Sequence, residues 1–392
     1  MTDHPSPGSA LFELGFRPFF LAGGLFAALA IPLWVTAWLG GTGAWQPTGG
    51  WLAWHLHEML FGFVMAIVAG FLLTAVQNWT GIPGLSGRPL MALAMLWLLA
   101  RMAWLAGLPP WLVIALDVLF IPALAAIMAR SLWRARQRRN YPLVLILVLL
   151  ALCNLISLAG LALNDYALLR QGSLGGLWLI AALMGVIGGR VIPFFTQRGL
   201  ELPEQASTAP WLDHLILIGS ISIALLMLSG VALQPRLATG LLFALLGAAH
   251  LIRLMVWHHP GIWRVPLLWS LHVAYAWLVL ALYAMALWHL GWLVDFSQAI
   301  HLLTIGSMDG MILAMLARVS LGHTGRPLKP VPAMSLAFIL LNLAVPVRVW
   351  LAPVWPQTGF WLAALCWSGA FVLFVCFYAR ILYRPRPDGR PG

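Results

Sequence analysis

Six histidines lie within long apolar stretches of the sequence, where an ionisable side chain costs roughly 3 kcal/mol on membrane-insertion scales. A group that is kept at this cost is a candidate for function. The sequence has no CxxC motif and no cage of carboxylates, so the expected chemistry is ligation of haem or copper rather than of calcium or a structural zinc. The six residues are His55, His57, His250, His272, His289 and His301. The other five are expected in water: His4, His214, His258 and His259 at a terminus or a helix end, and His323 in a cytoplasmic loop.

His57 and His301 are predicted to be the axial ligands of a haem b. Each lies in the first turns of an apolar stretch that enters from the same side, within roughly 10 Å of that boundary at 1.5 Å per residue. His55 is two residues from His57, about 200° around the helix, so both cannot face one cofactor. We prefer His57 because it lies deeper and shares a face with apolar side chains. His55 is left as either a ligand of a neighbouring metal or a boundary residue.

A second site is predicted around His250 and His272. Arg253 follows His250 by three residues, and Tyr275 follows His272 by three, so each pair shares a helical face. An imidazole and a phenol suit a redox metal, such as copper, or a proton relay. Hydrogen bonding between helices is the alternative for each histidine.

Glu58, beside His57, is expected to orient the imidazole or to take up protons; the alternative is a helix cap. Asp117 and Asp309 also lie inside apolar stretches and are expected to pair with a neighbouring Arg or His. These three carboxylates suggest no continuous proton wire.

A bound haem also needs cations for its propionates. Arg190 and Arg318 are favoured because they adjoin glycine-containing turns, whereas Arg101, Arg236 and Arg348 are expected to be boundary residues whose charged ends reach the interface. The full set of candidates is Arg101, Arg170 and Arg348 on one side and Arg190, Arg253 and Arg318 on the other.

These residues must be positioned by membrane helices, because 62% of the 392 residues are apolar and only 8% are charged. That composition excludes an ordinary soluble domain. We expect an all-α, polytopic helix bundle in which a single transmembrane domain (18–384) lies between an N-terminal segment (1–17) and a tail (385–392). The twelve predicted spans are about 18–40, 51–77, 88–107, 110–133, 141–163, 173–196, 209–232, 235–257, 263–290, 295–319, 330–351 and 355–380.

The distribution of Lys and Arg predicts the orientation. Eighteen of the 22 basic residues fall on one side of the twelve-span arrangement and four on the other. The positive-inside rule then places both termini in the cytoplasm and the first turns of spans 2 and 10 on the outer side. The net charge of +11 is thus explained by topology, and no nucleic-acid partner is expected.

Several strings resemble the NnrS family over essentially the whole chain. They are FELGFRPFFLAGGLFAALAIPLW, WHLHEMLFGF, AGFLLTAVQNWTG, GGRVIPFF, HLIRL, LLWSLHVAYAW and HLLTIGSMDGMILAMLARVSLGHTGRPL. The resemblance implies a bacterial inner-membrane protein that contains haem and copper and is linked to nitric oxide and denitrification. His289 lies outside the matching strings, and Asp309 departs from the small or uncharged residue expected at its position. The residues in matching motifs are His55, His57, Glu58, Arg190, His250, Arg253, His272, Tyr275, His301, Arg318 and His323.

The predicted function is therefore haem and copper binding in nitric oxide metabolism or protection against nitrosative stress. If the protein is an enzyme, the expected reaction is reductive handling of nitric oxide. Tyr275 and Glu58 would then transfer protons, and the electrons would arrive from quinol or a periplasmic donor. Histidines on spans 2 and 10 are also similar in outline to the haem–copper oxidase superfamily, but the paired histidines of its metal sites are absent from the matching spans. The alternatives are a non-catalytic sensing or assembly protein and a secondary transporter, although no convincing internal repeat stands out.

Overall fold

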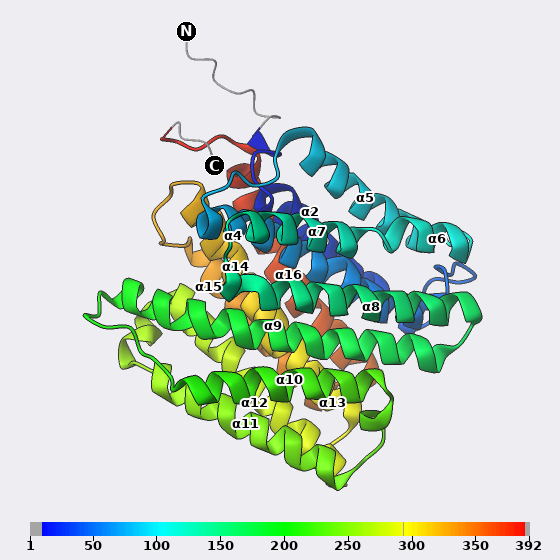
Figure 1. Cartoon of the computed structure of the whole chain (residues 1–392). Coiled ribbons are helices and arrows are strands. Elements are labelled where there is room, and N and C mark those ends of the chain that lie inside the picture. Colours follow the sequence, from blue (N-terminus) through cyan, green and yellow to red (C-terminus); the bar gives the residue numbers. More distant parts are fainter. Residues whose placement is uncertain (1–9, 293, 389–392) are drawn as a thin grey trace. The chain divides into compact units, whose positions relative to one another are not determined.

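The computed structural model describes residues 10–292 and 294–388, and in these the chain forms helices and turns with no strand (Figure 1). The all-α prediction is confirmed, as is the number of spans: twelve helices are long and apolar enough to cross a membrane. The spans are α2 (Phe16–Trp38), α3–η1–α4 (Gly50–His57, Glu58–Val64, Met65–Thr80), α5 (Gly87–Leu105), α6–α7 (Pro110–Asp117, Phe120–Arg134), α8 (Tyr141–Leu163, preceded by the 3₁₀ turn η2, Arg138–Asn140), α9 (Tyr166–Leu200), α10 (Pro210–Leu228), α11 (Leu237–Trp257), α12 (Pro266–His289), α13–η5–α14 (Phe296–His301, Leu302–Asp309, Gly310–His323), α15–η6 (Pro332–Pro346, Val347–Leu351) and α16 (Pro356–Tyr383). The 3₁₀ turns η3 (Val231–Leu233) and η4 (Pro260–Arg264) precede α11 and α12.

Lipid offers no hydrogen-bond partner to the backbone, so each apolar stretch must satisfy its own amides as a helix. Proline supplies helix starts, because its missing N–H is not needed in a first turn. It stands at the first position of α6, α10, α12 and α15 as Pro110, Pro210, Pro266 and Pro332. The tight turn from α8 to α9 is made by Asn164, which adopts a left-handed conformation with φ of 53°.

The chain packs as two compact units, each with its own interior. The first comprises residues 1–173, 316–328 and 371–392, and the second comprises 174–315 and 329–370. In the second unit, α11 and α12 lie side by side (Figure 1). Helices α9, α14 and α16 each contribute residues to both units.

Spans 2, 6 and 10 are the most enclosed. Between 72% and 83% of the most apolar 18-residue window of each is buried, against 39–67% for the other nine spans. Two of the three, spans 2 and 10, contain the predicted haem ligands. Polar residues in these spans are therefore shielded from lipid, as intramembrane functional groups must be.

Local irregularities in the helices lie beside the predicted site residues. The π-helical segments η1 and η5 begin directly after His57 and His301, and such segments occur frequently at functional sites. Span 4 is interrupted between α6 and α7, because Pro122 cannot donate a backbone hydrogen bond to residue 118 and its ring crowds that carbonyl. The interruption leaves Asp117 at the end of α6, with its side chain directed into the first unit.

Candidate functional site

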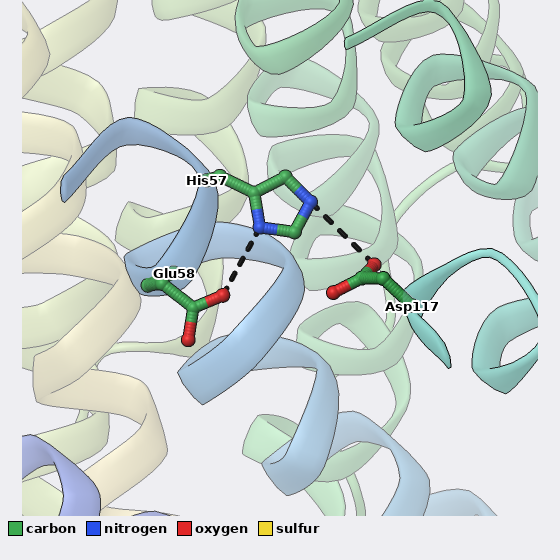
Figure 2. Close-up of side chains that lie close together, drawn as sticks. All are labelled: His57, Glu58 and Asp117. Carbon is green, nitrogen blue, oxygen red and sulfur yellow. Dashed lines mark hydrogen bonds and ion pairs between the residues drawn. The ribbon is translucent and has the colours of Figure 1, made fainter. Parts of the chain in front are cut away.

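A buried cluster of charged side chains surrounds His57 in the first unit. Figure 2 shows the ring between Glu58 and Asp117: His57 Nδ1 lies 3.1 Å from Glu58 Oε1, and Nε2 lies 3.5 Å from Asp117 Oδ1. Arg101 joins the two carboxylates, with its Nε 2.8 Å from Glu58 Oε2 and its Nη2 hydrogen-bonded to Asp117 Oδ2. All four side chains are at most 5% exposed.

Neighbouring helices fix the imidazole and the carboxylate of this cluster. Asn154 of α8 directs its Oδ1 to His57 Nε2 at 2.9 Å, and its Nδ2 donates to Asp117 Oδ1 at 3.0 Å. Trp104 of α5 stacks on the imidazole with ring centroids 4.4 Å apart, while its Nε1 donates to Asp117 Oδ2 at 3.2 Å. Four different spans thus supply polar groups to one buried network.

The hydrogen-bond pattern indicates a charge-balanced cluster. If both carboxylates are ionised, both nitrogens of His57 face oxygen acceptors, and the ring donates twice, as an imidazolium does. Two cations, His57 and Arg101, then balance two carboxylates. A buried ion-pair network of this kind is strongly destabilised when one partner is removed, because the remaining charge is left unpaired.

The cluster corrects one expectation, rules out one alternative and confirms another expectation. Arg101 is not a boundary residue that reaches the interface: it is buried and paired with two carboxylates. Glu58 is not a helix cap, since its carboxylate faces His57 and Arg101. The expected pairing of Asp117 with a neighbouring Arg or His is confirmed.

Ligand atoms of His57, Glu58 and Asp117 lie within 4.8 Å of one another, close enough to hold one metal ion. Arg101 already pairs with both carboxylates, however, so a divalent cation would have to displace its guanidinium. Iron ligation by His57 would likewise require Glu58 or Asn154 to turn away. The haem-ligand role of His57 remains a prediction.

A second buried cluster lies in the second unit, between α11 and α12. His250 Nδ1 lies 2.7 Å from the Tyr275 hydroxyl oxygen, and Arg253 Nη1 donates to the same oxygen at 3.3 Å. Arg253 also donates to the Gly185 carbonyl at 2.9 Å and to the Asp213 carboxylate. The arginine therefore links a half-exposed carboxylate at the start of α10 to a fully buried phenol.

Three glycines of α9 make room for this cluster. A Cβ added at Gly185 would lie 3.3 Å from His250 Cε1, and one added at Gly189 would lie 3.2 Å from Arg253 Nη1. Gly188 faces Tyr275 in the same way, at 3.4 Å. Positions i, i+3 and i+4 share one helical face, which explains the glycines of the GVIGGR string. Arg190, which ends that string, lies inside continuous α9 and adjoins no turn, contrary to expectation.

The other histidines differ in which ring nitrogen carries the proton. His272 donates from Nδ1 to the Leu268 carbonyl at 2.9 Å, and its buried Nε2 has no hydrogen bond in the described part of the chain. A backbone carbonyl that holds Nδ1–H is the usual arrangement behind an Nε2 metal ligand. His289 shows the opposite: its Nδ1 accepts the Arg236 backbone N–H at 3.2 Å, so its proton is on Nε2.

His301, like His272, directs Nδ1 to the carbonyl four residues earlier, Ser297 O, at 2.6 Å. The ring of His55 stacks on Trp34 with centroids 4.5 Å apart and does not join the His57 cluster. His214, His258 and His259 are exposed as predicted, while His4 lies outside the described residues.

Three further expectations need correction. Arg318 is buried within α14 and adjoins no turn, and His323 is the last residue of that helix rather than part of a loop. Asp309, only 3% exposed, has no hydrogen bond or ion pair among residues 10–292 and 294–388, so the expected pairing is not found there. The anion-binding roles of Arg190 and Arg318 remain predictions.

Sequence reasoning missed Asn154 and Asp213. Asn154 interrupts the apolar run 141–163, and that interruption was an available signal. Asp213 is within four residues of the start of α10, where a carboxylate is unremarkable in a sequence. Its role depends on Arg253, 40 residues away, which nothing local indicates.

The chain has twelve apolar helices, which define a multi-pass membrane protein. Two clusters of histidine, arginine and carboxylate side chains lie among these helices, and most of these side chains are buried. A model of the NnrS protein family matches residues 10–386. The chain belongs to the NnrS family, and family membership makes it a membrane protein of the nitric oxide response. No curated protein matches the chain.

Proposed function

We propose that the protein binds haem b and copper in the bacterial inner membrane and acts in nitric oxide metabolism or protection against nitrosative stress, through reductive handling of nitric oxide. The observation that carries this proposal is the His250–Tyr275–Arg253 cluster, in which a phenol holds Nδ1 of a buried imidazole, with no second hydrogen bond to that ring from the residues that the structure describes. Family membership supplies the link to nitric oxide.

The chain offers a suitable ligand at His250. If Nδ1 keeps the proton and donates it to Tyr275, the lone pair is on Nε2, which lies beside Gly185 and the side chain of Ile216. The phenol oxygen then accepts from both His250 and Arg253, which uses its two lone pairs and leaves its own O–H to donate elsewhere. His272, with its proton held at Nδ1, is the other copper ligand proposed in this unit, and His55 remains a third candidate.

Bound copper and haem would supply electron transfer and a binding position for nitric oxide. The reduction of nitric oxide consumes protons as well as electrons, and Tyr275 is placed to give a proton beside the imidazole. Arg253, balanced by Asp213, stabilises the phenolate that remains. Electrons would come from quinol or a periplasmic donor.

For haem b, His301 fits the role of an axial ligand better than His57. The Ser297 carbonyl holds the His301 proton at Nδ1, which places the lone pair on Nε2. His57 is the proposed second ligand and requires its hydrogen bonds to Glu58 and Asn154 to open. The propionates would be held by arginines of the predicted set.

The test is an optical spectrum and metal analysis of protein purified after haem-replete and copper-replete expression. We expect a b-type spectrum that changes on reduction, and copper that is lost in His250→Ala. His289→Ala is the matched control, because it removes a buried imidazole whose Nδ1 is an acceptor, and it should keep the copper. A colourless, metal-free wild-type preparation would refute the proposal.

Activity separates the competing functions. Consumption of nitric oxide by reduced, haem-loaded protein, followed with a nitric oxide electrode, supports the reductive role. A fully loaded protein that consumes none supports sensing or assembly instead. Substrate flux in proteoliposomes without bound haem supports a transporter.

A further inference from the structure

Spans 2 and 10 carry the same residues at a constant separation of 244 positions. Although no repeat is apparent from the apolar pattern, the polar and turn residues reveal one. The separation is the same at each pair because no residue is inserted or lost between them. The pairs are His57 and His301, Gly62 and Gly306, Thr80 and Thr324, Gly81 and Gly325, and Pro83 and Pro327.

Backbone structure follows the same repeat. The π-helical segments begin at residues 58 and 302, which again differ by 244. Gly81 and Gly325, just past the ends of their helices, have φ values of 71° and 68°. A π-helix is rare, so its start at equivalent positions makes a chance match of letters a poor explanation.

The repeat extends to the next two spans. Arg101 is followed by the string Trp-Leu-Ala at 104–106, and Arg348 is followed by the same string at 350–352. At the ends of spans 4 and 12, the pattern Ala-Arg-x-Leu-aromatic-Arg occurs at 129–134 and at 379–384, with Leu132 and Leu382 both fully buried. Spans 2–4 and 10–12 are therefore two copies of one three-span segment, inserted in the same direction.

The two copies differ in their carboxylates. In the first copy, Arg101 is compensated by Glu58 and Asp117. The position equivalent to Glu58 is Leu302 in the second copy. Around Asp117 the separation between the copies changes from 246 residues, at Pro110 and Pro356, to 250 residues, at Ala129 and Ala379. The counterpart of Asp117 therefore lies between 363 and 367, where the sequence AALCW has no acidic residue. The second copy has the histidine and, one position away from the repeat, an arginine, but it has neither acid at the equivalent positions.

Arg348 consequently has no carboxylate partner in the described part of the chain. Its Nη2 donates to Ser297 Oγ at 3.3 Å, and its Cζ lies 4.9 Å from the centroid of the Phe360 ring. Ser297 also holds His301 through its carbonyl oxygen. Gln298 Nε2 donates to Val349 O at 2.9 Å, which ties α13 to η6 and keeps the arginine beside the histidine.

We propose that Arg348, Ser297 and His301 form a binding site for the carboxylate of a ligand at the predicted outer ends of spans 10 and 11, with Arg348 as the carboxylate-binding residue. The first copy shows which chemistry suits this arginine, because there the chain itself provides a carboxylate to it. An arginine is well matched to a carboxylate through its planar array of N–H donors.

If the protein binds haem, as proposed above, the carboxylate is a haem propionate, and in this form the inference rests on the proposed function. A small free oxyanion such as nitrite has the same recognition chemistry. In either case Arg348 is a positioning residue: it anchors a ligand beside His301 and takes no part in electron transfer.

The experiment compares iron protoporphyrin IX with its dimethyl ester, in which both carboxylates are masked. Each is titrated into full-length protein purified from haem-depleted cells, and binding is followed by absorbance. We expect wild type to prefer the free acid. Arg348→Gln should weaken binding of the free acid about 10- to 100-fold and leave binding of the ester unchanged. The matched control is Arg236→Gln, which removes an exposed arginine of the same predicted side and should change neither.

Each result decides the question. An equal loss for acid and ester in Arg348→Gln, or no loss for either, excludes a haem propionate as the ligand. If nitrite binding is also unchanged in this variant, the site is overturned and Arg348 is a structural or interfacial residue. Calorimetric titration of nitrite into the same samples tests whether the ligand is a free oxyanion. A free oxyanion is supported if Arg348→Gln loses nitrite binding while the porphyrin titrations show no difference between acid and ester. If wild type binds neither porphyrin, the proposed function fails, while the nitrite titration still tests the site. No binding of porphyrin or nitrite refutes both proposals.

Discussion

The charge balance of the His57 cluster predicts strong coupling between Arg101 and Asp117. Asp117→Asn keeps the shape of the side chain but leaves the two cations with one carboxylate, Glu58. Arg101→Gln leaves two carboxylates with one cation, His57. Removing one partner of a buried pair typically costs about 3–5 kcal/mol, so each variant should lose about 3 kcal/mol of unfolding free energy or more, since these side chains are at most 5% exposed.

The double variant Asp117→Asn/Arg101→Gln restores neutrality, because Glu58 and His57 remain as one anion and one cation. Its loss should be smaller than the sum of the single losses by at least about 1.5 kcal/mol, as expected for residues of one network. Denaturant-induced unfolding in mixed micelles, followed by tryptophan fluorescence, measures all three values. Arg134→Gln removes an exposed arginine and should change stability by less than about 0.5 kcal/mol. Additive losses, or an Asp117→Asn loss below about 1 kcal/mol, would refute the charge-balanced network.

Three further predictions concern packing, the copper site and a turn. Gly160→Ala should destabilise the protein by about 2 kcal/mol or more in the same unfolding assay, because its Cβ would lie 2.3 Å from the Leu169 backbone nitrogen; Gly322→Ala, whose Cβ meets nothing closer than 3.7 Å, should be nearly neutral. Tyr275→Phe should lower copper affinity about 10- to 100-fold in a competition titration with a copper chelator, because the partner that holds the His250 proton at Nδ1 is lost. Unchanged copper binding would show that the phenol does not support the ligand. Asn164→Ala should cost about 1 kcal/mol at its left-handed φ of 53°, whereas Asn164→Gly should cost less; equal losses would contradict a conformational cause.

The span count could be predicted because it depends on a local property. A stretch of about 20 apolar residues forms a helix in lipid whatever its neighbours are. The same rule failed at finer detail. The apolar pattern places residues 164–172 in a loop, but residues 166–172 belong to α9, because Asn164 and Asp165 suffice to make the turn. The π-helical segments after His57 and His301 had no sequence signal that an apolar pattern could reveal.

The buried arginines show the limit of local reasoning most clearly. Arg101 and Arg348 both lie just before a Trp-Leu-Ala string near the end of an apolar helix, and both are expected from the sequence to be boundary residues. Arg101 is instead enclosed by carboxylates from spans 2 and 4, which are 43 residues before it and 16 residues after it. Whether an arginine near a helix end reaches water or a carboxylate is decided by the helices packed around it.

The sequence by itself determined an all-helical membrane protein of twelve spans and the family, and it supplied the candidates for metal binding. These follow from hydrophobic length, residue chemistry and motif, which are properties of the chain read in order. Only the tertiary structure decided the state of each histidine. His57 has a partner at both nitrogens. His272 donates from Nδ1 to a backbone carbonyl, and Nδ1 of His250 faces the Tyr275 hydroxyl. His289 accepts a hydrogen bond at Nδ1, so it has the opposite tautomer to His272. The physical reason is that a hydrogen bond depends on distances of about 3 Å between groups on different helices or turns, and no sequence spacing specifies these.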